Sequence, residues 1–195
     1  MKIQNILIVI SIVVIAAVLA VLVWKPFREM NQPYTYNGFV FEREGPLWYT
    51  QVQVGKYLYR VPFHYLPSEL ENVSVSGSVD KRFLTGNGVY LVFDPLADKS
   101  EMPYIFVTIF DLETNLLTYF GRTPEVACSR QDNAACKNYT VTNCSVDNSS
   151  PIIQIESFGN ASVFLRGNCV YLRGSGNETI KAAERFTLLY YGIMP

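Results

Sequence analysis

The chain has 195 residues, with 16 Lys or Arg against 17 Asp or Glu, and its net charge is −1 at pH 7. This balance excludes the strongly basic surface with which nucleic-acid-binding proteins neutralise phosphates, so we expect no nucleic-acid partner. The length allows one domain of ordinary size in addition to a membrane segment.

Residues 6–24, ILIVISIVVIAAVLAVLVW, contain a single polar side chain, that of Ser11. A helix of this length spans roughly 28 Å at about 1.5 Å per residue, which matches the hydrocarbon thickness of a bilayer. A cleaved secretory signal is the alternative, but the apolar run is longer than the core of such signals, and no A-x-A pattern precedes a plausible cleavage point. Trp24 lies where interfacial aromatic residues anchor membrane helices. We therefore expect a single retained transmembrane helix.

This segment divides the chain into a cytoplasmic tail over residues 1–5, a short stalk over 25–33 and one extracytoplasmic domain over 34–195. Lys2 precedes the apolar segment and Lys25 follows it, so the positive-inside rule favours neither orientation. The cysteines and glycan acceptors described below decide the orientation, because both belong on the outer side of the membrane. We expect a cell-membrane protein whose N-terminus lies in the cytoplasm and whose domain lies outside.

The first part of the domain predicts β-strands. Residues 36–43 (YNGFVFER), 47–54 (LWYTQVQV) and 56–65 (KYLYRVPFHY) are short, rich in aromatic and β-branched residues, and separated by the turn sequences EGP and VGK. Residues 67–77 are expected to turn the chain. Residues 88–95 (GVYLVFDP) predict a fully apolar strand in the centre of the sheet.

Ten aromatic residues lie between residues 34 and 65. In the third predicted strand, aromatic and apolar side chains alternate with Arg60 and His64, which is typical of a half-buried strand with an aromatic inner face. We therefore expect most of these rings in the core. The alternative is an exposed surface that stacks on a sugar or peptide, with Arg60 and His64 as its ligand-binding residues.

Two helices are expected. Over residues 103–120 the polar residues recur at helical spacing (Thr108, Asp111, Asn115 and Thr118), opposite an apolar stripe (Ile105, Ile109, Leu112, Leu116 and Phe120), so we expect a helix rather than a strand. A second helix is predicted over 178–191, with Asn177 as its cap. Strands are predicted over 151–158 and 162–174, the latter either continuous or folded into a hairpin near Gly167.

Four cysteines, Cys128, Cys136, Cys144 and Cys169, lie in the last third of the chain. No close cysteine pair and no neighbouring histidine accompany them, so a zinc site is a poor fit and two disulfides in an oxidising compartment are expected. Four cysteines allow three pairings. We expect Cys128–Cys136 to close a local loop and Cys144–Cys169 to tie a strand to a hairpin.

Six Asn-x-Ser/Thr triplets are acceptors for N-linked glycans: Asn72, Asn138, Asn143, Asn148, Asn160 and Asn177. The alternative is that Asn, Ser and Thr co-occur because all three are turn residues. Five of the six acceptors lie beyond residue 130, so glycans there would shield the C-terminal half. A protein or glycan partner at the cell surface would then more easily meet the N-terminal half.

The sequence contains no recognisable catalytic constellation. His64 is the only histidine, which argues against histidine clusters and against most catalytic metal sites, and we expect it to make local hydrogen bonds at a strand end. Residues 86–88 (GNG) lack the helix and lysine of a phosphate loop, and residues 94–101 lack the ligand spacing of a calcium loop. We expect no catalytic residue, cofactor or metal.

Four blocks, YNGFVFER, LWYTQVQVG, YRVPFHYLPSELENV and RFTLLYYGIMP, resemble blocks in uncharacterised single-anchor membrane proteins of archaea. The resemblance covers most of the domain, contains no catalytic signature and implies no function, but it agrees with glycosylation outside the membrane. The predicted fold is α+β: a transmembrane helix followed by a largely antiparallel sheet with two packed helices. The predicted function is a non-enzymatic binding module or accessory subunit of the cell envelope. The alternative is an envelope hydrolase whose site has no sequence signature.

Overall fold

The computed structural model describes residues 12–20, 32–131, 136–146 and 150–195. Residues 12–20 are helical. Within these ranges, no helix is both long and apolar enough to cross a bilayer. The rest of the predicted transmembrane segment 6–24, the predicted tail 1–5 and stalk residues 25–31 lie outside the described residues.

Four antiparallel strands form a small sheet: β1 (Tyr34–Tyr36), β2 (Phe39–Glu44), β3 (Leu47–Val54) and β4 (Tyr57–Phe63). The prediction of one strand over 36–43 is wrong, because Asn37 and Gly38 form a two-residue turn between β1 and β2 with φ of 45° and 84°. Asn-Gly favours such a turn, since both central residues of a type I′ turn need positive φ. The predicted strands over 47–54 and 56–65 are confirmed.

A second, larger sheet has the order β5-β10-β11-β9-β6-β7-β8. Its strands are β5 (Ser74–Val79), β6 (Gly88–Phe93), β7 (Thr123–Cys128), β8 (Thr140–Val141), β9 (Ile152–Glu156), β10 (Ser162–Gly167) and β11 (Cys169–Arg173). Among these described strands, β10 and β11 pair antiparallel as a hairpin, and the other pairings are parallel. The α+β class is confirmed, whereas the expectation of a largely antiparallel sheet holds only for the small sheet. The reason is that β6 connects to β7 through a helical crossover, which makes the two strands parallel.

Helical segments follow the strands at four places: η1 (Pro67–Glu69), α2 (Lys81–Thr85), α3 (Met102–Thr114) continued by the π-helical turn η2 (Asn115–Tyr119), and α4 (Asn177–Tyr190). Both predicted helices are therefore confirmed, with α3 and η2 together covering the first. Asn177 is the first residue of α4 rather than its cap, because Gly176 with φ of 59° occupies the capping position. Residues 67–77, which we expected only to turn the chain, contain η1 and the first part of β5.

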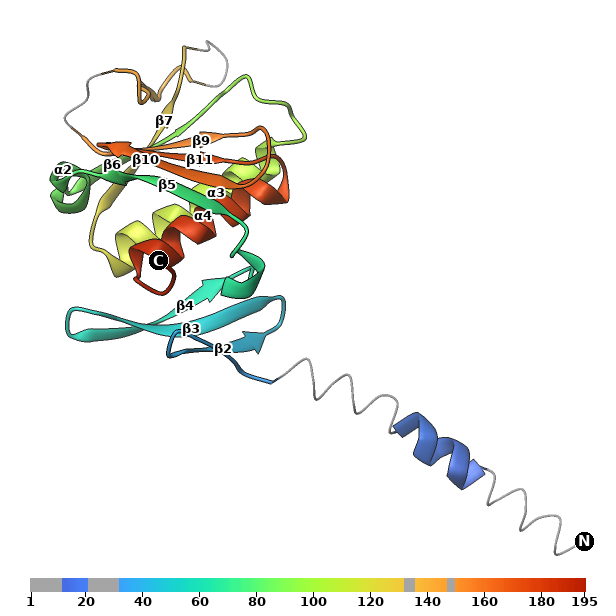
Figure 1. The fold of residues 1–195 in the computed structure, drawn as a ribbon. Coiled ribbons are helices and arrows are strands. Elements are labelled where there is room, and N and C mark those ends of the chain that lie inside the picture. The colour runs from blue at the N-terminus through green and yellow to red at the C-terminus, as the bar shows by residue number, and fades with distance from the viewer. Residues whose placement is uncertain (1–11, 21–31, 132–135, 147–149) are drawn as a thin grey trace, which may run out of the picture.

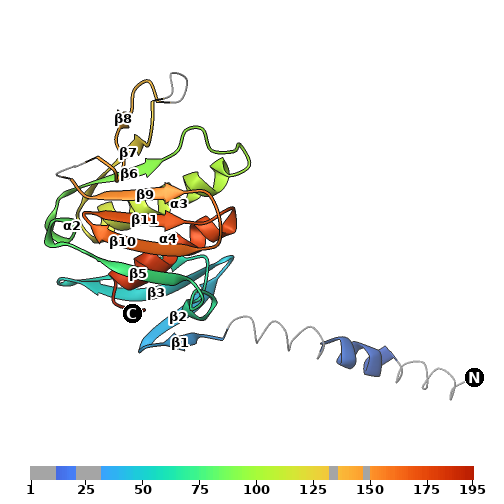
Figure 2. The ribbon, with the colours of Figure 1, turned by 45° about the horizontal axis from the view of Figure 1, so that its top comes forward.

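The helices α3 and α4 lie between the two sheets (Figures 1 and 2). One face of the pair packs on the large sheet, where α4 contacts β10 and β11. The small sheet covers the other side, where Phe63 meets Tyr191 and Tyr59 meets Tyr119. Consecutive residues Thr179–Leu188 of α4 are therefore buried with the single exception of Lys181. A helix enclosed in this way cannot send its polar side chains to solvent, so each needs a partner inside the protein.

Part of the polar stripe of α3 is buried. Thr108 and Asn115 are buried, while Phe106, Phe110 and Leu117 are exposed. The stripe turns inward because the interior between the sheets contains polar partners: the Asn115 side chain accepts a hydrogen bond from the Tyr191 hydroxyl at 2.7 Å. The apolar stripe also lies in the core, since Ile105, Ile109 and Leu112 are buried, so α3 is enclosed on more than its apolar side.

Most aromatic residues of the small sheet lie in or against the core, as predicted. Phe41 and Phe63 are fully buried, and six others pack against the core, namely Tyr34, Tyr36, Phe39, Trp48, Tyr59 and Tyr65. Tyr57 is exposed at the end of β4. Tyr49 lies on the outer face of the sheet. The same buried cluster continues through the helices into the large sheet, so the two sheets share one core.

Both predicted disulfides, Cys128–Cys136 and Cys144–Cys169, are present. The second joins the segment after β8 to the start of β11, over a Cα–Cα distance of 5.8 Å. This segment covers part of the large sheet's outer face, where Cys144 and Cys169 pack against Val92, Ala127 and Ile152. Two disulfides and no free cysteine among the described residues are typical of a protein in an oxidising environment outside the cytoplasm.

Thr108 generates a prediction about stability. Its side chain is fully buried and its hydroxyl has no hydrogen-bond partner among the described residues. Thr108→Val keeps the shape and removes the unpaired hydroxyl, so we expect the free energy of unfolding to rise by about 1 kcal/mol. Urea unfolding of the full chain in detergent, followed by tryptophan fluorescence, measures the change.

Thr179→Val is the matched control, because Thr179 is equally buried but donates its hydroxyl to the Gly174 carbonyl at 2.9 Å. That substitution should lower the free energy of unfolding by about 1 kcal/mol. Equal destabilisation by both substitutions would show that Thr108 has a partner.

Candidate functional site

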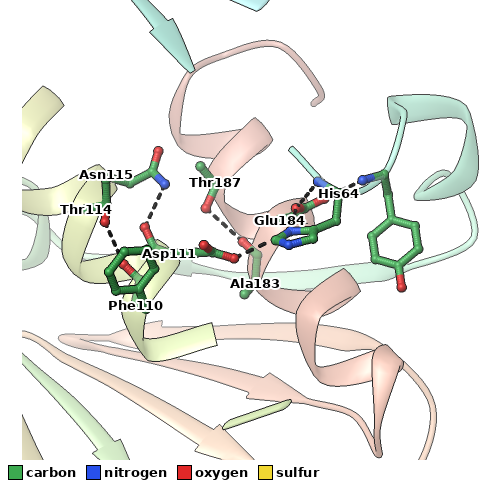
Figure 3. A network of polar contacts seen from close by, with 9 residues as sticks. His64, Phe110, Asp111, Thr114, Asn115, Ala183, Glu184 and Thr187 are labelled. Atoms are coloured by element: carbon green, nitrogen blue, oxygen red, sulfur yellow. Dashed lines mark hydrogen bonds and ion pairs between the residues drawn. The ribbon is translucent and has the colours of Figure 1, made fainter. Parts of the chain in front are cut away.

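His64 lies directly after β4, where the chain leaves the small sheet and passes close to α4. Here Glu184 of α4 binds two successive backbone groups: its Oε1 accepts from the His64 N–H at 2.5 Å and its Oε2 accepts from the Tyr65 N–H at 2.9 Å. The His64 Nδ1 also lies 2.8 Å from Glu184 Oε1 (Figure 3). The Glu184 side chain is only 7 % exposed, against 37 % for His64. A buried carboxylate therefore joins the small sheet to the helices.

Asp111 of α3 completes the cluster. Its Oδ2 lies 3.5 Å from His64 Nδ1, and its side chain is 30 % exposed. The potential ligand atoms of His64, Asp111 and Glu184 all lie within 4.8 Å of one another. We refer to these three residues as the His64 cluster. The expectation of local hydrogen bonds at His64 is wrong, since its partner Glu184 is 120 positions away in the chain.

The pKa values of the three groups are shifted by their mutual contacts and by burial. The hydrogen bond with Glu184 raises the pKa of His64, and both carboxylates add to this while burial opposes it. Burial raises the pKa of Asp111 to about 6, and the nearby His64 opposes the rise. Burial likewise raises the pKa of Glu184, against the hydrogen bonds from His64 and Tyr65. Two carboxylates thus compete for a single imidazole.

The space beside the cluster is small. A cavity of about 10 Å³ is lined by both carboxylates of the cluster and by Asn115 and Thr187, among others. This volume is near the minimum for one water molecule and far below that of a pocket for an organic substrate. The cluster can exchange protons, bind a water molecule or bind a single ion, but the cavity offers no room for a larger ligand.

Arg60, the other candidate predicted from the sequence, lies apart from the His64 cluster on the outer face of the small sheet. It pairs with Glu44 at 2.6 Å, and its guanidinium lies 4.1 Å from the centre of the Tyr49 ring. Both Arg60 and Tyr49 line a groove of about 670 Å³ on this face, together with Val40, Glu42, Gln51, Gln53 and Leu58. We call it the small-sheet groove. The structure therefore separates the two predicted ligand-binding residues into different environments.

The predicted glycan acceptors lie around the large sheet and the helices. Asn72, Asn138, Asn160 and Asn177 are exposed. Asn143 is partly buried, and its side-chain amide donates to the Ser129 carbonyl at 3.1 Å. Asn148 lies outside the described residues. No acceptor lies in the four strands of the small sheet.

Three comparisons with known proteins gave no match: no family model, no curated protein and no solved structure resembles the chain. The residues and their geometry are therefore the basis for assigning a function. Sequence analysis identified His64 but missed Asp111 and Glu184, which lie on different helices and belong to no recognisable motif. Their only signal was that each interrupts a largely apolar helical pattern.

Replacing Glu184 tests how much its hydrogen bonds to the end of β4 stabilise the protein. Glu184→Ala leaves the N–H groups of His64 and Tyr65 without their acceptor, so we expect the free energy of unfolding to fall by about 3 kcal/mol. Glu113→Ala on α3, which removes a partly exposed carboxylate with no hydrogen bond in the described residues, should change it by less than about 0.5 kcal/mol. Urea unfolding of both variants measures the difference. Similar losses would contradict a special role for Glu184.

Proposed function

We propose that the protein is a membrane-anchored module on the outer side of the cell membrane, and that it acts by binding a partner rather than by catalysis. The observation that supports this best is the combination of a groove on the small sheet with a disulfide-bonded large sheet. The first offers a binding face, and the second is typical of an extracytoplasmic location.

The proposed topology is a transmembrane helix over residues 6–24, a stalk over 25–33 and an extracytoplasmic domain from residue 34 onward. The apolar composition of 6–24 and the two disulfides support this order. The stalk can reach at most about 3.6 Å per residue, or roughly 30 Å in all. The small sheet, which begins at Tyr34, would therefore lie close to the membrane surface.

The small-sheet groove is the proposed binding face. Its lining combines amides (Gln51 and Gln53), a cation stacked on a ring (Arg60 on Tyr49) and exposed apolar side chains (Val40 and Leu58). Such a mixture of hydrogen-bonding and apolar groups suits an extended protein segment. Glycans on the exposed acceptors around the large sheet would leave this face accessible. A protein of the cell envelope is therefore the proposed partner.

The second candidate function is an envelope hydrolase that uses His64 as a base. The contact of His64 with two carboxylates favours it, because a base held in one orientation by an acid is typical of hydrolases. The cavity beside the two carboxylates disfavours it, because about 10 Å³ leaves no room for a substrate between them. The binding function remains the better supported of the two.

The proposed topology predicts modifications of the protein isolated from its native cells. Mass spectrometry should find glycans on exposed acceptors such as Asn138 and Asn160, and both disulfides should be oxidised. Asn143 should be occupied less often, because its amide nitrogen is already hydrogen-bonded. Bare asparagines together with reduced cysteines would contradict an extracytoplasmic location.

The proposed binding face predicts a specific pattern of crosslinks in intact cells. A photoreactive residue at exposed Gln51, inside the groove, should crosslink to a discrete protein, whereas one at exposed Lys137 should not. Arg60→Ala should reduce the crosslink from Gln51 by roughly tenfold, as expected for a contact residue at a binding hot spot.

Arg43→Ala serves as the control, because Arg43 also belongs to the small sheet but does not line the groove. Its removal changes the charge by the same amount and should leave the crosslink intact. A crosslink that survives Arg60→Ala, or one to glycan material alone, would contradict a protein partner in the groove.

A further inference from the structure

We propose that His64, Asp111 and Glu184 bind one zinc ion, which ties the end of the small sheet to both central helices. The inference concerns a site separate from the small-sheet groove and does not depend on the proposed function. It rests on the donor types, their spacing, their charge balance and the space beside them.

The donors match zinc in type and position. Zinc binds imidazole nitrogen and carboxylate oxygen at about 2.0–2.2 Å, so two ligands of a tetrahedral ion lie about 3.3–3.5 Å apart. His64 Nδ1 and Asp111 Oδ2 are already separated by 3.5 Å. The 2.8 Å between His64 Nδ1 and Glu184 Oε1 needs to lengthen only by about half an ångström, within reach of a small side-chain rotation. An imidazole also favours zinc over calcium or magnesium, which prefer oxygen ligands alone.

The charge balance favours a cation. Two carboxylates meet one imidazole, and within the described residues neither carboxylate pairs with a lysine or arginine. Lys181 of α4 pairs with Glu178 instead, and the Arg185 guanidinium donates a hydrogen bond to the carbonyl of Pro195. A divalent ion supplies the positive charge that the surrounding side chains do not. The imidazole can then act as a neutral ligand through Nδ1.

The surroundings favour a zinc site with three protein ligands and one water ligand. Glu184 is held in place by the N–H groups of His64 and Tyr65, which is how supporting hydrogen bonds orient metal ligands. The cavity of about 10 Å³ lies against both carboxylates and has room for one water molecule as the fourth ligand. The three ligands come from three different elements of the fold, so the ion would cross-link all of them.

The test is zinc binding to the full chain in detergent, purified through a tag without histidine and stripped with a chelator. Isothermal titration with Zn²⁺ should show one ion per chain, and Mg²⁺ and Ca²⁺ should bind far more weakly. At a Zn²⁺ concentration of about a hundred times Kd, the Tm should rise by roughly 5–10 °C.

The zinc affinities of variants distinguish a residue that binds the ion from one that only stabilises the fold. Asp111→Asn leaves the contact between His64 and Glu184 in place, so the chain should fold, but its zinc affinity should fall by about tenfold or more. Asp111→His supplies another zinc ligand at the same position and should retain binding. Glu113→Gln, two residues further along α3, makes the same change of charge outside the cluster and should bind Zn²⁺ as the native chain does.

Two results would overturn the proposal. One is native zinc affinity no higher than that of Asp111→Asn, because Asp111 is then not a ligand. The other is loss of affinity in Asp111→His equal to that in Asp111→Asn, because a ligand exchange should preserve a true metal site. Circular dichroism and the Tm without zinc confirm that each variant is folded, so that either result is decisive.

Discussion

The buried carboxylate of Glu184 is the interaction on which the arrangement of layers depends. Helix α4 lies between two sheets and has almost no side facing water, so a charged residue on it must find partners inside the protein. Glu184 finds them in two backbone N–H groups at the point where β4 ends. The small sheet is consequently attached to the helices by directional bonds as well as by aromatic packing, which fixes its angle and position more precisely than packing alone.

The polar residues of α3 follow from the same enclosure. Asp111 and Asn115 belong to a stripe that would face water on an isolated amphipathic helix. In this protein the two residues face the space between α3, α4 and the small sheet. Asn115 meets Tyr191, and Asp111 meets His64. The apolar stripe that contains Ile105 and Ile109 is buried as well, and the exposed Phe106 and Phe110 lie on a third side of the helix. The interior is thus apolar against the large sheet and partly polar toward the small one, and His64, Asp111 and Glu184 converge at that boundary.

Local sequence patterns were sufficient to predict most strands and both main helices, but not how these are arranged in space. The alternation in 56–65 and the apolar run in 88–95 predict strands because strand periodicity is local. The cysteine spacing indicated two disulfides but left three pairings open, of which the expected one is present. Strand β5, with the sequence SVSGSV, was missed because serine and glycine give no strand signal. The parallel pairing of β6 with β7 joins residues 35 positions apart, and the convergence of His64, Asp111 and Glu184 depends on contacts across 47 and 120 positions. No local pattern contains that information.

The distance along the chain between β4 and α4 also determines when the protein can fold. Ribosomes make the small sheet early and α4 last among the described elements, so the aromatic inner face of β1–β4 emerges long before the helix that covers it. The side-chain amide of Asn37, in the turn between β1 and β2, meets its acceptor even later, because it donates to the carbonyl of Ile193 at 3.0 Å. Nascent chains that stop short of α4 would expose Phe41 and Phe63 to solvent and would be clients for chaperones or proteases. Synthesis of α4 is therefore the step that allows the core to close.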